Sequence, residues 1–172
     1  MRIAVFGMGY VGCVSAACLA DLGHDVVGVD VNRDKLAMVQ QGRSPIIEPG
    51  LDALLGAAVA AGRLTVSDDA ARTVAETDLS MVCVGTPSRS NGDLDTSYIE
   101  HVVGEIGAGL RQRTGTPHVV AIRSTLLPGV LVRQVMPALE RASGNQTQAA
   151  HLLGINRDQV RYRIEKFGLG KA

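Results

Sequence analysis

The chain has 172 residues with 17 basic and 17 acidic side chains and is 46% hydrophobic, which suits one well-packed domain with a small appendage. It contains no run of about 18 apolar residues and does not start with a signal peptide, so we expect a cytoplasmic protein without a membrane span. Cys13, Cys18 and Cys83 have neither disulfide nor metal spacing, and we expect buried free thiols and no metal site.

The chain opens with a buried strand that runs into a glycine-rich turn. Residues 3–6 are apolar, and Gly7, Gly9 and Gly12 follow with the spacing G-x-G-x-x-G. The first glycine permits a tight turn, the second lets a pyrophosphate approach the backbone, and the third lets the next helix pack on the sheet. That helix, expected over residues 11–22, would direct its unpaired N–H groups at the phosphates.

A second strand carries the residue that selects the cofactor. Residues 26–29 are apolar and end at Asp30, whose carboxylate can accept hydrogen bonds from the ribose hydroxyls of NAD. A carboxylate there repels a 2′-phosphate, so NAD is favoured over NADP. The alternative is a βαβ unit with an accidental glycine pattern. The order of strand, helix, strand and terminal acid favours dinucleotide binding.

Strands and helices alternate through the rest of the chain. We expect strands over residues 63–67, 79–84 and 118–122, and helices over 32–41, 51–61, 68–76, 98–111 and 130–142. Ser97 with Glu100 predicts a capping box for the helix that begins at 98. This alternation indicates an α/β fold with a Rossmann-type doubly wound parallel sheet. Thr86 and Thr125 follow two of the strands, where ligands bind in such sheets, but turn and cap roles explain them equally well.

Five ordered segments carry a family resemblance: GMGYVG at 7–12, GVDV at 28–31, SPIIEPGL at 44–51, VGTP at 84–87 and RSTLLPG at 123–129. From residue 1 to about 144 the chain resembles the N-terminal domain of the UDP-glucose/GDP-mannose 6-dehydrogenase family. The loop over 88–95 is most similar to the GDP-mannose branch, which makes GDP-mannuronate for alginate. The resemblance implies that NAD contacts Tyr10, Val11, Asp30, Lys35, Thr86 and Thr125, in addition to the glycine turn.

The resemblance also implies an activity that this sequence does not complete. The family oxidises a sugar C6 alcohol to a carboxylate with two NAD⁺, through a thioester on a catalytic cysteine. The family's cysteine motif and nucleotide-sugar domain have no counterpart here, and none of the three cysteines matches the catalytic position. We therefore assign no catalytic residue. We expect NAD binding without turnover, with a nucleotide sugar bound only if a complementing half is present.

The end of the chain follows a different pattern, so we divide the chain into a Rossmann domain at 1–142 and an all-α tail at 143–172. Residues 1–144 hold 12 basic and 15 acidic side chains, whereas residues 145–172 hold 5 and 2. Asn145 and Asn156 predict the N-caps of two short helices around a turn at Gly154. This pattern predicts a helix-turn-helix and resembles the Fis-type module that ends NtrC-like activators.

The tail leaves three interpretations open. It could bind duplex DNA through residues 145–167 as part of a homodimeric, NAD-sensing regulator, it could only complete the fold as a basic hairpin, or it could be a fusion product. For the first interpretation, the resemblance implies base or phosphate contacts from Arg157, Gln159, Arg161, Tyr162, Arg163 and Lys166.

Overall fold

The computed structural model describes residues 1–90, 93–113, 117–126, 129–135 and 137. Its strands are β1 (Arg2–Phe6), β2 (Asp25–Val29), β3 (Leu64–Ser67), β4 (Leu79–Val82) and β5 (Val119–Ile122). Its helices are α1 (Tyr10–Asp21), α2 (Arg33–Gln40), α3 (Leu51–Ala60), α4 (Ala70–Glu76) and α5 (Ser97–Gln112), followed by a π-helical turn, η1 (Leu131–Val135).

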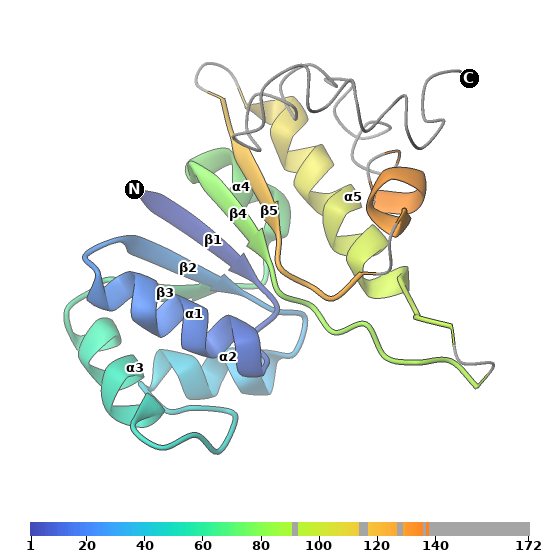
Figure 1. Ribbon diagram of the computed structural model, residues 1–172. Coiled ribbons are helices and arrows are strands. Elements are labelled where there is room, and N and C mark those ends of the chain that lie inside the picture. Colours follow the sequence, from blue (N-terminus) through green and yellow to red (C-terminus); the bar gives the residue numbers. More distant parts are fainter. Residues whose placement is uncertain (91–92, 114–116, 127–128, 136, 138–172) are drawn as a thin grey trace.

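The five strands form one parallel sheet in the order β3-β2-β1-β4-β5 (Figure 1). The central strand β1 pairs with β2 on one side and with β4 on the other, so that Ile3 lies opposite both Val26 and Leu79. The chain therefore winds outward from β1 in two directions. This arrangement confirms the predicted Rossmann-type α/β fold.

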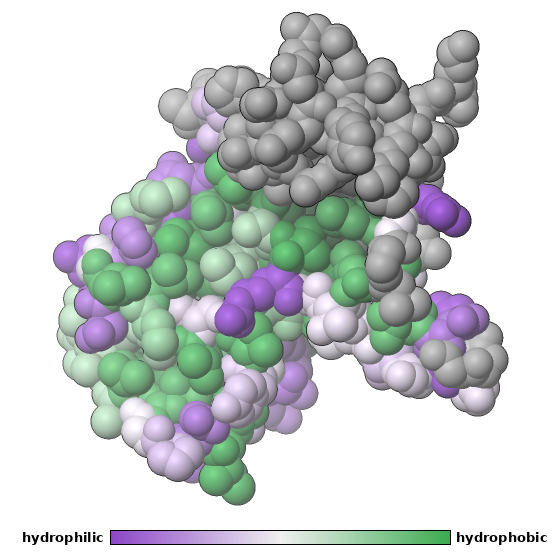
Figure 2. Space-filling model, viewed as in Figure 1, coloured by the Kyte–Doolittle hydropathy of each residue, from purple (hydrophilic) through white to green (hydrophobic). Residues whose placement is uncertain are grey.

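Two apolar layers cover the sheet, one on each face. Alternate residues of β1 supply both layers: Ile3 and Val5 pack with α1, α2 and α3, while Ala4 and Phe6 pack with α4 and α5. Because both faces are covered, β1 must be apolar at every inward position, which explains the unbroken run in the sequence. By contrast, all four residues of β5 are only half-buried, and apolar residues gather over β4 and β5 in the view of Figure 2.

The helix ends show where the local signals were sufficient. Asn32 caps α2, which lies within the helix predicted over residues 32–41, and its side chain accepts hydrogen bonds from the N–H groups of Asp34 and Lys35. The predicted capping box at Ser97 is wrong, because α5 begins at Ser97 and its N-cap is Thr96. The Oγ1 of Thr96 donates to the carboxylate of Glu100 at 2.7 Å.

The neighbouring loop explains this shift. Asp95 accepts a hydrogen bond from the Ser97 N–H at 3.1 Å and pairs with Arg89 at 3.0 Å. These bonds, chiefly those with Ser97, lower the pKa of the Asp95 carboxyl to about 2. The carboxylate of Asp95 therefore takes part in starting the helix, which a search for the capping-box pattern does not detect.

Two further expectations concern the burial of the cysteines and the last predicted helix of the Rossmann domain. Cys13 and Cys83 are buried as predicted, but Cys18 is exposed, because it lies on the face of α1 that is turned away from the core. Of the helix predicted over residues 130–142, the structure describes residues 130–135, which include the π-helical turn η1, and residue 137. Residues 136 and 138–142 lie outside the described residues. None of the described helices has the length and apolarity needed to cross a membrane.

Candidate functional site

The candidate site lies at the carboxyl edge of the sheet, where the direction of winding reverses between β1 and β4. Gly7 follows β1, Asp30 follows β2, and Thr86 and Thr125 come shortly after β4 and β5. Because all the strands are parallel, these segments meet at one edge of the molecule (Figure 1). This is the position at which open α/β sheets bind their ligands.

The three glycines of the turn serve different needs. Gly7 has φ +94°, which side chains rarely tolerate, and its N–H donates to the Val29 carbonyl at 2.7 Å. A Cβ on Gly12 would lie 1.8 Å from the Gly7 carbonyl oxygen, so α1 can pack on the turn only with glycine there. A Cβ on Gly9 would meet nothing within 4 Å. Gly9 therefore faces open space, as the approach of a pyrophosphate requires.

The N-terminus of α1 opens onto this same space. Gly9 is the N-cap and offers no side chain, and the first helical hydrogen bond runs from the Cys13 N–H to the Gly9 carbonyl at 2.9 Å. The N–H groups of the first turn have no partner within the helix, which makes them donors for an anion. Tyr10 and Val11 in this turn are 56% and 37% exposed.

Asp30 connects the second strand with the glycine turn. Its Oδ2 accepts a hydrogen bond from the Met8 N–H at 2.7 Å, and its Oδ1 accepts one from the Asn32 N–H at 2.9 Å. Lys35 Nζ lies 3.8 Å from the same Oδ2. Each carboxylate oxygen has two lone pairs, so the group retains capacity for a ribose hydroxyl. Asp30 thus suits the predicted ribose contact and also holds the turn in place.

Met8 and Gly28 belong to this arrangement and were not predicted. Met8 is fully buried, and a Cβ on Gly28 would lie 2.8 Å from its sulfur. A glycine in the interior of a strand signals a close approach of another segment, and here that segment is the side chain of Met8. Gly28 therefore leaves room for Met8, whose N–H in turn binds Asp30.

The ends of β4 and β5 are joined by side-chain hydrogen bonds. Thr86 Oγ1 donates to the Thr125 carbonyl at 3.0 Å, and Ser124 Oγ donates to the Val84 carbonyl at 2.7 Å. Arg123 reaches across to α1, where its Nη1 donates to Ser15 Oγ at 3.2 Å. Thr86 and Thr125 thus have a structural role together at the edge where a ligand would bind.

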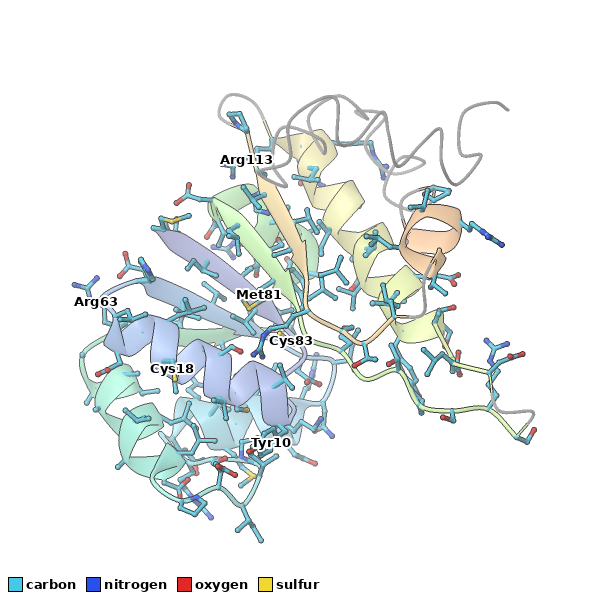
Figure 3. The ribbon with its side chains drawn as sticks, viewed as in Figure 1. Tyr10, Cys18, Arg63, Met81, Cys83 and Arg113 are labelled. Atoms are coloured by element: carbon cyan, nitrogen blue, oxygen red, sulfur yellow. The ribbon has the colours of Figure 1, made fainter. Side chains whose placement is uncertain are left out.

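A contact from the α2–α3 loop completes the edge. The Tyr10 hydroxyl donates to Glu48 Oε2 at 3.0 Å, although the two residues are 38 positions apart. Figure 3 shows Tyr10 at the start of α1, on the side of this loop. The sequence singled out the segment around Glu48 only as part of a motif, with no role for the carboxylate.

The thiols near the site are not activated. Cys83 lies where β4 ends (Figure 3), and burial raises its pKa to about 11 although Arg123 acts in the opposite direction. Burial likewise raises the pKa of Cys13 to about 11. Both thiols are protonated at neutral pH and are poor nucleophiles. The described residues also contain no cluster of three or more metal-ligating side chains.

The residues predicted to contact DNA cannot be placed in the same way. Arg157, Gln159, Arg161, Tyr162, Arg163 and Lys166 lie outside the described residues.

Comparison with known proteins agrees with this geometry. Residues 1–161 match the UDP-glucose/GDP-mannose dehydrogenase family, NAD binding domain. The chain is 48% identical over 161 residues to GDP-mannose 6-dehydrogenase of Pseudomonas syringae pv. tomato, covering 94% of this chain and 36% of that protein. It is 42% identical over 147 residues to UDP-glucose 6-dehydrogenase of Rhizobium meliloti, covering 81% and 33%.

A solved structure gives the same result. The crystal structure of a ternary complex of GDP-mannose dehydrogenase from Pseudomonas aeruginosa superposes with a TM-score of 0.82 at 50% identity, covering 84% of this chain and 33% of that one. The chain thus spans about a third of the length of the relatives it matches. The family match passes the boundary predicted at residue 142 and continues to 161. By this match, and by the sheet and glycine turn, the chain belongs to the UDP-glucose/GDP-mannose dehydrogenase family and carries its NAD-binding domain.

Proposed function

We propose that this chain binds NAD at the carboxyl edge of its sheet. The diphosphate lies over Gly9 and the first turn of α1, and the adenosine ribose lies against Asp30 and Lys35. The observation that carries this proposal is the open space at Gly9, which the N-terminus of α1 borders. Asp30 is tied to the same turn, because its carboxylate accepts a hydrogen bond from the Met8 N–H. An anion and a ribose would find their partners there without rearrangement of the described backbone.

The other predicted cofactor contacts extend along the same edge. Tyr10 and Val11 form the exposed first turn of α1, and Gly7 and Gly12 shape the turn beneath it. Thr86 and Thr125 would contact the nicotinamide end, because they follow the strands on the far side of β1 from Asp30. Together, these residues and Asp30 would contact both ends of a dinucleotide.

We further propose that the domain serves a nucleotide-sugar 6-dehydrogenase, with GDP-mannose as the sugar nucleotide. The support is the higher identity to GDP-mannose 6-dehydrogenase, 48% against 42% for UDP-glucose 6-dehydrogenase. Burial raises the pKa of the two thiols near the site, Cys13 and Cys83, so neither is activated. Oxidation of the sugar therefore depends on groups beyond this site, and we expect this chain to bind NAD without turning over a sugar.

Calorimetric titration of the purified chain tests the proposal. We expect saturable binding of NAD⁺ and at least about tenfold weaker binding of NADP⁺, because the Asp30 carboxylate would lie against the 2′-phosphate. The absence of NAD⁺ binding, or equal affinity for the two cofactors, would contradict the proposed site.

DNA binding through residues 145–167 is the alternative function. Its support is the residue pattern of the tail, on which the predicted division at residue 142 also rests. The family match across that boundary gives the tail a competing assignment as part of the dehydrogenase.

A further inference from the structure

Hydrogen bonds and an apolar contact hold the loop between α2 and α3 to the start of α3 and to the core. The Ser44 N–H donates to Asp52 Oδ1 at 2.6 Å, and the Leu51 N–H donates to the Glu48 carbonyl at 3.2 Å. Ile46 is partly buried and packs against the core cluster to which α1, α2 and α3 contribute. The neighbouring Ile47 is fully exposed. The backbone of the loop is therefore fixed at its base while its outer part projects into solvent.

The side chain of Glu48 provides a link from this loop to the candidate site. Its Oε2 accepts the hydrogen bond from Tyr10, the first residue of α1, at 3.0 Å. Hydrogen bonding to Glu48 and the nearby negative charge raise the pKa of the Tyr10 phenol, which stays protonated and remains the donor. A hydrogen bond to a carboxylate is stronger than one between neutral groups, so it limits the rotation of a half-exposed ring.

We propose that Glu48 is a positioning residue for the cofactor site, which holds the Tyr10 ring beside the N-terminus of α1 before NAD arrives. The inference rests on the NAD binding proposed above. Tyr10 directly follows Gly9, where the diphosphate would lie, so the direction of its ring decides how it meets the ligand. A ring that is already fixed loses less conformational entropy when the ligand binds.

Two substitutions of Glu48 separate its hydrogen bond from its charge. Glu48→Ala removes the acceptor, and we expect the Kd for NAD⁺ to rise about threefold to tenfold, the range for immobilising one side chain. Glu48→Gln keeps an acceptor oxygen and should restore the Kd to within about twofold of the wild type. The matched control is Glu105→Ala on α5, which belongs to the opposite face of the sheet and should leave the Kd unchanged.

A second measurement reports on Tyr10 directly. With ¹³C label at the ring Cζ of tyrosine, a pH titration by NMR should show a raised pKa for the Tyr10 phenol, and this pKa should fall in both Glu48 variants. A role of Glu48 in overall stability alone would not move this signal. NAD⁺ should also shift the Tyr10 resonance in the wild type.

The outcomes distinguish this inference from the proposed function. If the wild type fails to bind NAD⁺, the proposed function is wrong and this inference with it. If the wild type binds NAD⁺ and Glu48→Ala binds it with the same Kd, only the role of Glu48 is refuted. An unchanged tyrosine titration in the Glu48 variants would also refute it.

Discussion

Two glycines of the same turn should respond in opposite ways to the same substitution. In Gly12→Ala, the new Cβ would lie 1.8 Å from the Gly7 carbonyl oxygen, whereas ordinary contact begins at 3.4 Å, so the atoms must separate by a further 1.6 Å. Both atoms are attached to the backbone, and no side-chain rotation can relieve the overlap. Either α1 moves away from the turn or the turn opens.

The energy follows from this geometry. Overpacking in a core costs about 1–3 kcal/mol where side chains can adjust, so we expect Gly12→Ala to lower the free energy of unfolding by at least about 3 kcal/mol. In Gly9→Ala, the Cβ meets nothing within 4 Å and φ is −88°, which suits alanine. The stability of Gly9→Ala should stay within about 1 kcal/mol of the wild type, since a less flexible unfolded chain offsets a weaker N-cap.

NAD⁺ binding should be weakened in Gly9→Ala, although this variant is expected to keep its stability. The Cβ of Gly9→Ala would occupy the space of the diphosphate, so we expect the Kd for NAD⁺ to rise at least about tenfold, equivalent to about 1.4 kcal/mol. Urea unfolding followed by circular dichroism measures the stabilities, and the midpoint for Gly12→Ala should fall by about 1.5 M for an m-value of about 2 kcal/mol/M. Wild-type affinity in Gly9→Ala would refute the diphosphate position. Wild-type stability in Gly12→Ala would refute the helix contact.

Three further predictions test other parts of the molecule. Asp30→Ala should weaken NAD⁺ binding about tenfold or more, because it removes the ribose acceptor and leaves the Met8 N–H without its partner; an unchanged calorimetric Kd would disprove the ribose assignment. Burial lowers the pKa of His118 below its ordinary 6.5, so the unfolded chain binds the proton first as the pH falls. The stability from His118 is therefore complete above pH 6.5 and is lost towards the folded pKa, with a slope of up to about 1.4 kcal/mol per pH unit. Urea unfolding between pH 5 and 7 should show this slope in the wild type and not in His118→Gln, and a slope unaltered in the variant would rule out His118 as its source. Charge reversal of Arg157, Arg161 and Arg163 in the tail should abolish retention of duplex DNA and leave NAD⁺ affinity unchanged. Unaltered DNA retention in this variant would exclude DNA binding through these residues.

The pH prediction has a simple structural basis. His118 Nδ1 lies 2.9 Å from the Thr77 carbonyl, which can only accept, so this nitrogen carries the proton. Its Nε2 lies 2.8 Å from Ser80 Oγ and accepts from that hydroxyl. The neutral ring is therefore fully satisfied in a buried position, where a second proton would create a desolvated positive charge. Arg113, whose Nη1 also donates to the Thr77 carbonyl, further disfavours a positive charge there.

Much of the fold could be predicted because its signals are local. The apolar run of β1, the glycine spacing and the acid after β2 each lie within a few residues, and their chemistry predicts strand, turn and ribose acceptor without knowledge of the rest. The cap at Asn32 is of the same kind, because its bonds reach only two and three residues ahead. Local patterns were insufficient where a neighbour competed, as Asp95 does at the start of α5.

The sequence by itself determined the class of the fold and the order of its elements, and it predicted the glycine and carboxylate positions of a dinucleotide site. The tertiary structure decided which distant residues meet there: Glu48 with Tyr10, Asp30 with Met8, and Thr86 with Thr125. It also decided that Cys18 is exposed while Cys13 is buried. The physical reason is that periodicity and turn chemistry act over a few residues, whereas these contacts depend on how the parallel strands bring their carboxyl ends to one edge.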